Sequence, residues 1–281
     1  MSSDEESVAA RLFVSDPLTV GAEITFDADQ THYLRAVLRL GPGDALALVN
    51  GRDGEARAVI EALEKRMGRA RIAAITRPFA PEPDLWLLFA PIKRARLDTI
   101  IEKATELGAS RLLPTVTRRS NMGRVSLERM AAIAREATEQ CERLTLPEIE
   151  EAAPLAKRLA TWPDDRLLIV ADEGGEAPDA LTALAPLPEG QKLALLIGPE
   201  GGFDPAERDQ LKALAIAPLP RHGGAEVNAV SLTAVERFVL RVSLGPRILR
   251  ADTAAVALLA LVQAQGGDWR NLGPRGSELA S

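Results

Sequence analysis

Several residue types and motifs are scarce or missing in this chain, and each absence excludes a class of protein. The single cysteine, Cys141, excludes an internal disulfide framework and a zinc site built from several cysteines. It is typical of a reducing compartment, so a cytoplasmic protein is expected. The longest apolar run covers nine residues, 254–262, whereas a membrane-spanning helix needs about 20. The first ten residues are acidic and lack any basic side chain, which is the wrong charge for a secretory signal.

Motifs for several common chemistries are also missing. The chain has two histidines, His32 and His222, and no Gly-x-Ser-x-Gly sequence, so a serine hydrolase triad is not expected. Neither the phosphate-binding Gly-x-x-x-x-Gly-Lys nor the dinucleotide-binding Gly-x-Gly-x-x-Gly occurs. The supply of metal ligands is limited to carboxylates, and their spacing does not indicate a metal site.

Charge is unevenly distributed along the chain. The formal net charge is −6, which argues weakly against nucleic acid as a partner. Residues 86–146 nevertheless hold 11 basic and 7 acidic side chains, a net charge of +4. This basic block has two interpretations, a solvated helix face laced with salt bridges or a phosphate-binding patch.

The distribution of apolar residues and turn signals predicts two domains. Residues 11–77 contain short strands, including a hairpin across 50–54, and fit a small β-barrel. Residues 78–83 are a proline-rich linker, which breaks both helix and sheet. From residue 84 to 269, apolar runs of strand length alternate with helical patterns, which predicts an α/β domain with a mostly parallel sheet. Residues 1–10 and 270–281 are expected to be tails, the first of them disordered.

Two helix starts and two glycine-bearing loops stand out in the α/β region. Asp204 is expected to begin one helix through a capping box, and Asp252 to cap the last one. The loops, 198–202 and 244–250, each leave a buried strand. Ligands of open α/β sheets bind outside the carboxyl ends of the strands, where glycines let the backbone approach a flat ligand. The alternatives are two tight strand-to-helix turns or a site for a small planar ligand such as a nucleoside.

The two loops read Gly-Pro-Glu-Gly-Gly at 198–202 and Leu-Gly-Pro-Arg-Ile-Leu-Arg at 244–250. With these two motifs the chain resembles the RsmE family of SPOUT methyltransferases. The resemblance extends to Lys-Ala-Thr-Glu-Leu-Gly at 103–108, Glu-Gln-Cys-Glu-Arg at 139–143 and, more weakly, the 32–39 stretch, so that it covers roughly residues 11–269. Members methylate N3 of a uracil in 16S rRNA.

The resemblance implies a fold, a cofactor and partners. The fold is a PUA-like β-barrel followed by an α/β domain with a C-terminal trefoil knot, and the protein is a homodimer without a membrane partner. S-adenosylmethionine is the cofactor, and no metal is required. The predicted binding site for this cofactor consists of Leu196, Gly198, Pro199, Glu200, Gly201, Gly202, Leu244, Gly245, Ile248, Leu249 and Thr253.

The predicted RNA-binding residues of the protein are Arg35, Arg39, Lys93, Arg94, Arg96, Arg118 and Arg119.

The implied reaction needs the uracil exposed and its N3 proton removed. A cation favours the resulting anion, and Arg143 or Arg247 is expected in that role. Glu139 is expected to be a proton acceptor or a hydrogen-bond anchor. Another interpretation of Arg143 is a cation that satisfies carbonyl groups at a helix C-terminus.

Two departures from the family pattern are present. Asp252 stands where the family usually has Glu, and the shorter carboxylate is still expected to cap the helix. The connection between the two loops is unusually long, and its extra stretch, 217–237, is a solvent loop, a lid or a defect. Two other functions stay open, a SPOUT enzyme with a different RNA target and a non-catalytic ribosome-binding factor.

Overall fold

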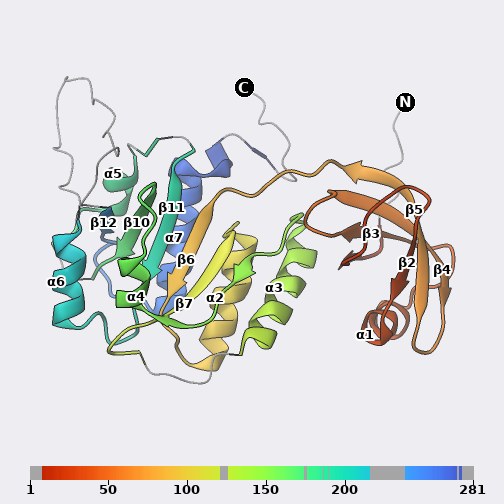
Figure 1. The fold of residues 1–281 in the computed structure, drawn as a ribbon, viewed down its shortest axis with the longest axis horizontal. Coiled ribbons are helices and arrows are strands. Elements are labelled where there is room, and N and C mark those ends of the chain that lie inside the picture. The colour runs from red at the N-terminus through yellow and green to blue at the C-terminus, as the bar shows by residue number, and fades with distance from the viewer. Residues whose placement is uncertain are drawn as a thin grey trace. The chain divides into compact units, whose positions relative to one another are not determined.

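The computed structural model describes residues 8–120, 126–173, 176–185, 187–188, 190–215, 238–270 and 272–273. The 217–237 stretch lies outside these residues. The chain forms two compact units (Figure 1). Residues 8–81 and Arg135–Leu146 make up the N-terminal unit, and Glu82–Ala134 and the described residues from Pro147 onward make up the α/β unit.

The N-terminal unit is built on one sheet. Within residues 8–81 five strands lie in the order β1-β3-β4-β5-β2, with β1 parallel to β3 and the other pairs antiparallel. The strands are β1 (Arg11–Phe13), β2 (Glu23–Phe26), β3 (Ala45–Val49), β4 (Glu55–Leu63) and β5 (Gly68–Arg77). Helix α1 (Ala28–His32) and a π-helical turn, η1 (Tyr33–Val37), follow β2.

The predicted hairpin is confirmed by β3 and β4. The Asn50 side-chain oxygen accepts hydrogen bonds from the backbone N–H groups of Arg52 and Asp53, at 3.1 and 2.9 Å. The Asp53 carboxylate in turn accepts from the backbone of Leu18 at 2.9 Å, and this bond lowers the pKa of Asp53. The turn is therefore closed by its own side chains, as expected for an Asn-Gly and Asp-Gly sequence.

The C-terminal half of α3 (Leu127–Cys141) belongs to the N-terminal unit. The Glu139 carboxylate accepts a hydrogen bond from the Phe13 backbone at 2.8 Å. Arg77 donates to the Glu142 carbonyl at 2.8 Å, and the buried Arg11 forms a salt bridge to the Glu142 carboxylate at 3.8 Å. The sequence pattern assigns residues 135–146 to the α/β domain, whereas in the structure these contacts join them to the N-terminal sheet.

The α/β unit contains a parallel sheet, as the sequence predicts. Its described strands lie in the order β12-β10-β11-β6-β7-β8, with β9 paired to β7. The strands are β6 (Leu85–Phe89), β7 (Arg111–Val116), β8 (Glu148–Ile149), β9 (Ala153–Pro154), β10 (Arg166–Ala171), β11 (Lys192–Ile197) and β12 (Val239–Val242). Besides α3, the helices are α2 (Arg94–Glu106), α4 (Leu155–Ala160), α5 (Ala180–Leu184), α6 (Pro205–Ala213), α7 (Ala251–Gly266) and the 3-10 helix η2 (Asp268–Arg270).

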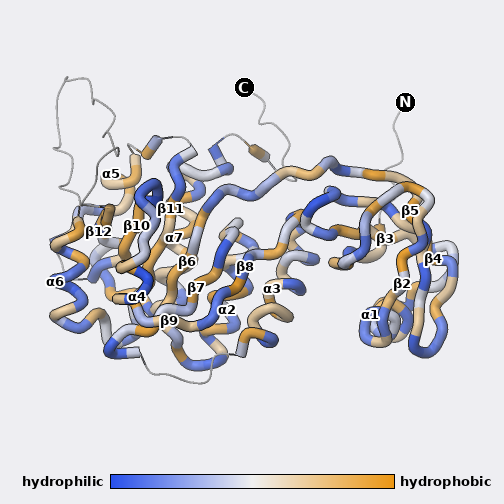
Figure 2. The backbone as a smooth tube through the Cα atoms, viewed as in Figure 1, coloured by the Kyte–Doolittle hydropathy of each residue, from blue (hydrophilic) through white to orange (hydrophobic). Residues whose placement is uncertain are grey.

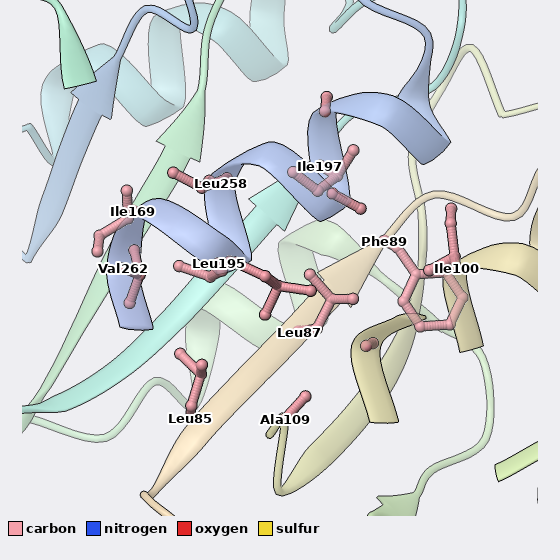
Figure 3. Packing of buried hydrophobic residues seen from close by; sticks show 14 of the residues in the cluster. Leu85, Leu87, Phe89, Ile100, Ala109, Ile169, Leu195, Ile197, Leu258 and Val262 are labelled. Atoms are coloured by element: carbon pink, nitrogen blue, oxygen red, sulfur yellow. The ribbon is translucent and has the colours of Figure 1, made fainter. Parts of the chain in front are cut away.

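The strands of this sheet are rich in hydrophobic residues (Figure 2). They contribute buried side chains to a core cluster on each face, and helices cover both faces. Alternate side chains of β6, β10 and β11 pack with α2, α5 and α7 on one face (Figure 3). The intervening side chains, among them Leu88 and Leu196, pack with α4 and α6 on the other. Each fully buried Leu or Ile contributes about 1.5–3 kcal/mol relative to exposure. None of the described helices is both long enough and apolar enough to cross a membrane.

The starts of α6 and α7 differ. The capping box of α6 is confirmed, with Asp204 accepting from Ala206 at 3.0 Å and Glu207 accepting from Asp204 at 3.1 Å. The prediction that Asp252 caps α7 is wrong, because Arg250 occupies the N-cap position without a side-chain cap bond. Asp252 lies in the first turn, where its charge still interacts favourably with the positive end of the helix dipole.

Candidate functional site

Three neighbouring parallel strands end together at one edge of the α/β sheet. Strand β10 lies between β11 and β12, so the loops that follow the three strands are adjacent. A cavity of about 270 Å³ lies at this edge. The structure therefore brings the two glycine loops, 198–202 and 244–250, to one hollow at the carboxyl ends of the strands, where ligands of such sheets bind.

Most of the predicted cofactor residues line this cavity. They are Gly198, Pro199, Glu200, Gly202, Leu244, Gly245, Ile248 and Leu249, together with Arg247 from the predicted catalytic set. Leu196, Gly201 and Thr253 are not among the lining residues. Side chains alternate along a strand, so Leu196 points into the core beneath α4 and α6, whereas its neighbour Ile197 reaches the cavity.

A third wall comes from the end of β10, which the sequence analysis did not single out. Ala171, Asp172 and Glu173 line the cavity, as do Phe203 and Arg208 beside the first loop. A signal was present, because two acidic residues and two glycines, 172–175, directly follow the buried strand. That pattern has the same form as the two loops that were recognised.

The walls of the cavity carry charges of both signs. Asp172 is only 7% exposed and accepts a hydrogen bond from Arg241 Nε at 2.6 Å. Its negative charge is therefore neutralised by a residue that does not itself line the cavity. Glu200 pairs with Arg96. Arg247 is exposed at the rim and makes no hydrogen bond or ion pair within the described part of the chain, and its neighbour Ile248 is 82% exposed. The lining thus combines apolar backbone-rich surface with a cation at the opening.

Two glycines of the first loop are required by close approach. Gly202 has a φ of +66°, and a Cβ there would lie 2.4 Å from a carboxylate oxygen of Glu173. A Cβ at Gly198 would lie 3.0 Å from the ring of Phe203. These positions keep the cavity open beside the polypeptide backbone, which is what a flat ligand needs.

The predicted RNA-binding residues fall into two groups. Arg35 and Arg39 are exposed on the N-terminal unit, and Lys93 and Arg94 are exposed at the start of α2. The other three residues are bonded to neighbouring groups. Arg96 and Arg119 contact the first glycine loop, and Arg118 contacts Asp204 at the start of α6. The basic block therefore includes salt bridges as well as exposed cations.

Glu139 and Arg143 belong to the N-terminal unit, and the cavity belongs to the α/β unit. Burial raises the pKa of the Glu139 carboxyl above its ordinary value, although the hydrogen bond from Phe13 opposes the shift. Arg143 is 7% exposed and donates to the Thr145 hydroxyl at 3.3 Å. Among the described residues, no group of histidine, cysteine and acidic side chains could hold a metal ion.

Comparison with known proteins identifies related domains over most of the chain. Residues 80–220 match a family described as the RNA methyltransferase domain, and residues 26–77 match the RNA methyltransferase PUA domain. Two relatives named ribosomal RNA small subunit methyltransferase E are each 32% identical to this chain. The protein from Rickettsia conorii aligns over 91% of this chain and 96% of its own length, and that from Synechocystis over 94% and 80%.

Solved structures show the same fold. A Legionella pneumophila protein in complex with S-adenosylmethionine is 27% identical, with a TM-score of 0.74 over 92% of this chain and 98% of its own. A ribosomal RNA small subunit methyltransferase E from Neisseria gonorrhoeae, 24% identical, has the same TM-score over 92% and 99%. The resemblance to the RsmE family and the predicted fold of a PUA-like domain before a SPOUT-type α/β domain are confirmed. This chain belongs to the ribosomal RNA small subunit methyltransferase E family.

Proposed function

We propose that this protein transfers the methyl group of S-adenosylmethionine to N3 of a specific uridine in 16S rRNA, on the small ribosomal subunit. The observation that carries the proposal is the cavity formed by both glycine loops at adjoining strand ends, in a chain that belongs to this family. A homodimer through the α/β domain, a C-terminal trefoil knot and a cytoplasmic location are proposed with it.

The residues of the cavity fit the cofactor. The cavity has a volume of about 270 Å³ and a wall with glycines at 198 and 202. It is lined by both apolar and charged side chains, a combination that suits a nucleoside with a charged tail. When bound, S-adenosylmethionine supplies an already activated methyl group, so the protein mainly has to align donor and acceptor. The exposed backbone of the two loops would bind the nucleoside, as the family resemblance implies.

Arg247 is well placed to act on the acceptor base. It lines the cavity, is exposed at the rim and has no neutralising partner in the described residues, so its charge favours the anion formed when uracil N3 loses its proton. Arg143 is the second candidate for this role. Glu139 is better supported as an anchor than as the proton acceptor, because its carboxylate already accepts the Phe13 N–H group.

Mass spectrometry of small-subunit rRNA tests the function directly. Deletion of the gene should remove N3-methyluridine from 16S rRNA, and the wild-type gene should restore it. If the deletion strain instead loses a methyl group at a different nucleotide, the protein is a SPOUT enzyme with another target. An unchanged rRNA together with no calorimetric binding of S-adenosylmethionine would indicate a ribosome-binding factor.

A further inference from the structure

Basic residues from two separate elements hold the first glycine loop. Arg96, in the first turn of α2, forms an ion pair with Glu200. Arg119, in the turn after β7, donates a hydrogen bond from its guanidinium to the Gly201 carbonyl at 2.9 Å. The contacts reach two consecutive residues of the loop, Glu200 and Gly201. They come from the segments that follow β6 and β7, the two strands next to β11 on one side of the sheet.

The start of α6 is fastened to the same turn. Glu207, which is 9% exposed, accepts the backbone N–H of Arg118 through one carboxylate oxygen at 2.8 Å and that of Asp204 through the other at 3.1 Å. One buried side chain thus caps α6 and binds it to the turn after β7. Both ends of the 198–204 segment are therefore fixed, one by β11 and the other by Glu207.

Between these ends the loop has little support of its own. Its internal backbone hydrogen bond runs from Gly202 N to Pro199 O, at 2.8 Å, and the Glu200 side chain is 41% exposed. Glycine-rich backbone has many alternative conformations, so contacts from outside are needed to keep one of them. Arg96 and Arg119 provide such contacts on the side chain of Glu200 and the carbonyl of Gly201.

We infer that Arg96 and Arg119 are positioning residues for the cofactor loop, and that this is their main role in place of a direct grip on RNA. The inference rests on the proposed function, because it assumes that the cavity binds S-adenosylmethionine. It separates Arg96 from Arg94, an exposed neighbour in the same turn of α2 that makes no hydrogen bond or ion pair to the loop in the described residues. Arg94 is therefore the matched control.

The test compares Arg96→Gln, Arg119→Gln and Arg94→Gln in the full-length protein. The dissociation constant for S-adenosylmethionine is measured by calorimetry, and the KM for the cofactor and kcat are measured on small subunits. Arg96→Gln and Arg119→Gln should each raise the dissociation constant and the KM roughly fivefold, with kcat at saturating cofactor little changed. Arg94→Gln should leave cofactor affinity unaltered.

A double variant identifies the partner of Arg96. If Arg96 acts through Glu200, Arg96→Gln combined with Glu200→Gln should bind the cofactor no more weakly than Arg96→Gln alone. Arg96→Lys should recover part of the affinity, because lysine keeps the charge but not the fork of donors.

Two outcomes overturn the inference in distinguishable ways. Unaltered cofactor affinity in Arg96→Gln and Arg119→Gln, with RNA binding weakened as much as in Arg94→Gln, would make all three simple RNA contacts. If the wild-type protein itself binds no S-adenosylmethionine, the proposed function fails first and the positioning role fails with it. Thermal unfolding of each variant checks that a loss of affinity does not come from misfolding.

Discussion

Gly202 shows how one residue keeps the cavity wall in place. An L side chain at its φ of +66° costs about 1–2 kcal/mol, and a Cβ would also collide with Glu173. Gly202→Ala should therefore raise the calorimetric dissociation constant for S-adenosylmethionine about tenfold. Gly190→Ala is the matched control, since Gly190 has a φ of +73° and open space around its would-be Cβ, at the opposite end of β11. Equal effects of both substitutions would mean that backbone strain alone is responsible.

Glu139 combines burial with a backbone hydrogen bond, and its raised pKa predicts a pH dependence. A carboxyl whose pKa is higher in the folded state than its ordinary 4.5 stabilises the fold below that value and loses this contribution as pH rises through the folded-state pKa. Glu139→Gln cannot titrate, and its amide oxygen can still accept the Phe13 N–H group. Urea unfolding from pH 4 to 8 should show wild-type stability falling relative to the variant as pH rises.

The same substitution separates the two roles considered for Glu139. If Glu139 is only a hydrogen-bond anchor, Glu139→Gln should retain most of the methylation rate. Loss of methylation in a variant with normal unfolding would instead make the carboxylate the proton acceptor.

Arg143 is the second candidate, after Arg247, for the cation on the acceptor side of the reaction. If Arg143 fills this role, Arg143→Ala should lower the methylation rate roughly 100-fold or more, because the cation that stabilises the uracil anion would be missing. Its calorimetric affinity for S-adenosylmethionine should stay nearly intact. Thr145→Val removes the hydroxyl that Arg143 binds at 3.3 Å and controls for the structural contact. Equal loss of methylation and of cofactor binding would refute the catalytic assignment.

At the scale of elements, a buried glutamine joins the last helix to α2. Gln263 of α7 is fully buried, donates to the Leu107 carbonyl at 2.7 Å and accepts from the Asp268 backbone at 3.3 Å. Gln263→Ala would remove the side chain that bonds the Leu107 carbonyl and the Asp268 N–H group, and it would leave a cavity. The free energy of unfolding should therefore fall by about 2–3 kcal/mol. Gln265→Ala, on the same helix but half-buried, should change it by less than about 0.5 kcal/mol. Urea denaturation measures both, and similar losses would contradict the role of Gln263.

Elements could be predicted from sequence where local chemistry decides them. Uninterrupted apolar runs identify β6, β10 and β11, because strands covered on both faces have no polar side. The capping box of α6 is a contact between residues three apart, so it too is visible locally. The N-cap of α7 was misplaced by two residues because Asp252 favours both an N-cap and a first helical turn.

Features that depend on distant contacts were not predictable in this way. The attachment of residues 135–146 to the N-terminal sheet depends on bonds such as Phe13 N to Glu139, across 126 residues of sequence. The acidic and glycine residues at 172–175 are visible in the sequence, but their place in the cavity wall depends on the order of the strands, which puts β10 between β11 and β12. The ion pair of Arg96 with Glu200 also joins residues that are far apart in the sequence. The sequence alone therefore could not show whether Arg96 holds the glycine loop or contacts RNA.

At the scale of the whole molecule, a protein with a net charge of −6 must concentrate cations locally to bind RNA. Several arginines of the α/β unit are already neutralised, including Arg96 by Glu200, Arg129 by Asp98 and Arg241 by Asp172. Exposed cations outside such pairs include Arg35 and Arg39 of the N-terminal unit. We therefore expect the N-terminal unit to contribute to RNA affinity independently of the cofactor.

Salt dependence measures this contribution. If Arg35 and Arg39 each neutralise one phosphate, the double variant Arg35→Gln/Arg39→Gln should weaken binding to small subunits roughly tenfold and make the slope of log K against log salt shallower by about 1.4–1.8. Its affinity for S-adenosylmethionine should not change, because both residues belong to the other unit from the cavity. Arg71→Gln is the control, since this exposed arginine of the same unit is bound to Glu61 at 2.6 Å and should leave the slope unaltered. An unchanged slope in the double variant would place the RNA contacts elsewhere, with the exposed Lys93 and Arg94 as the next residues to substitute.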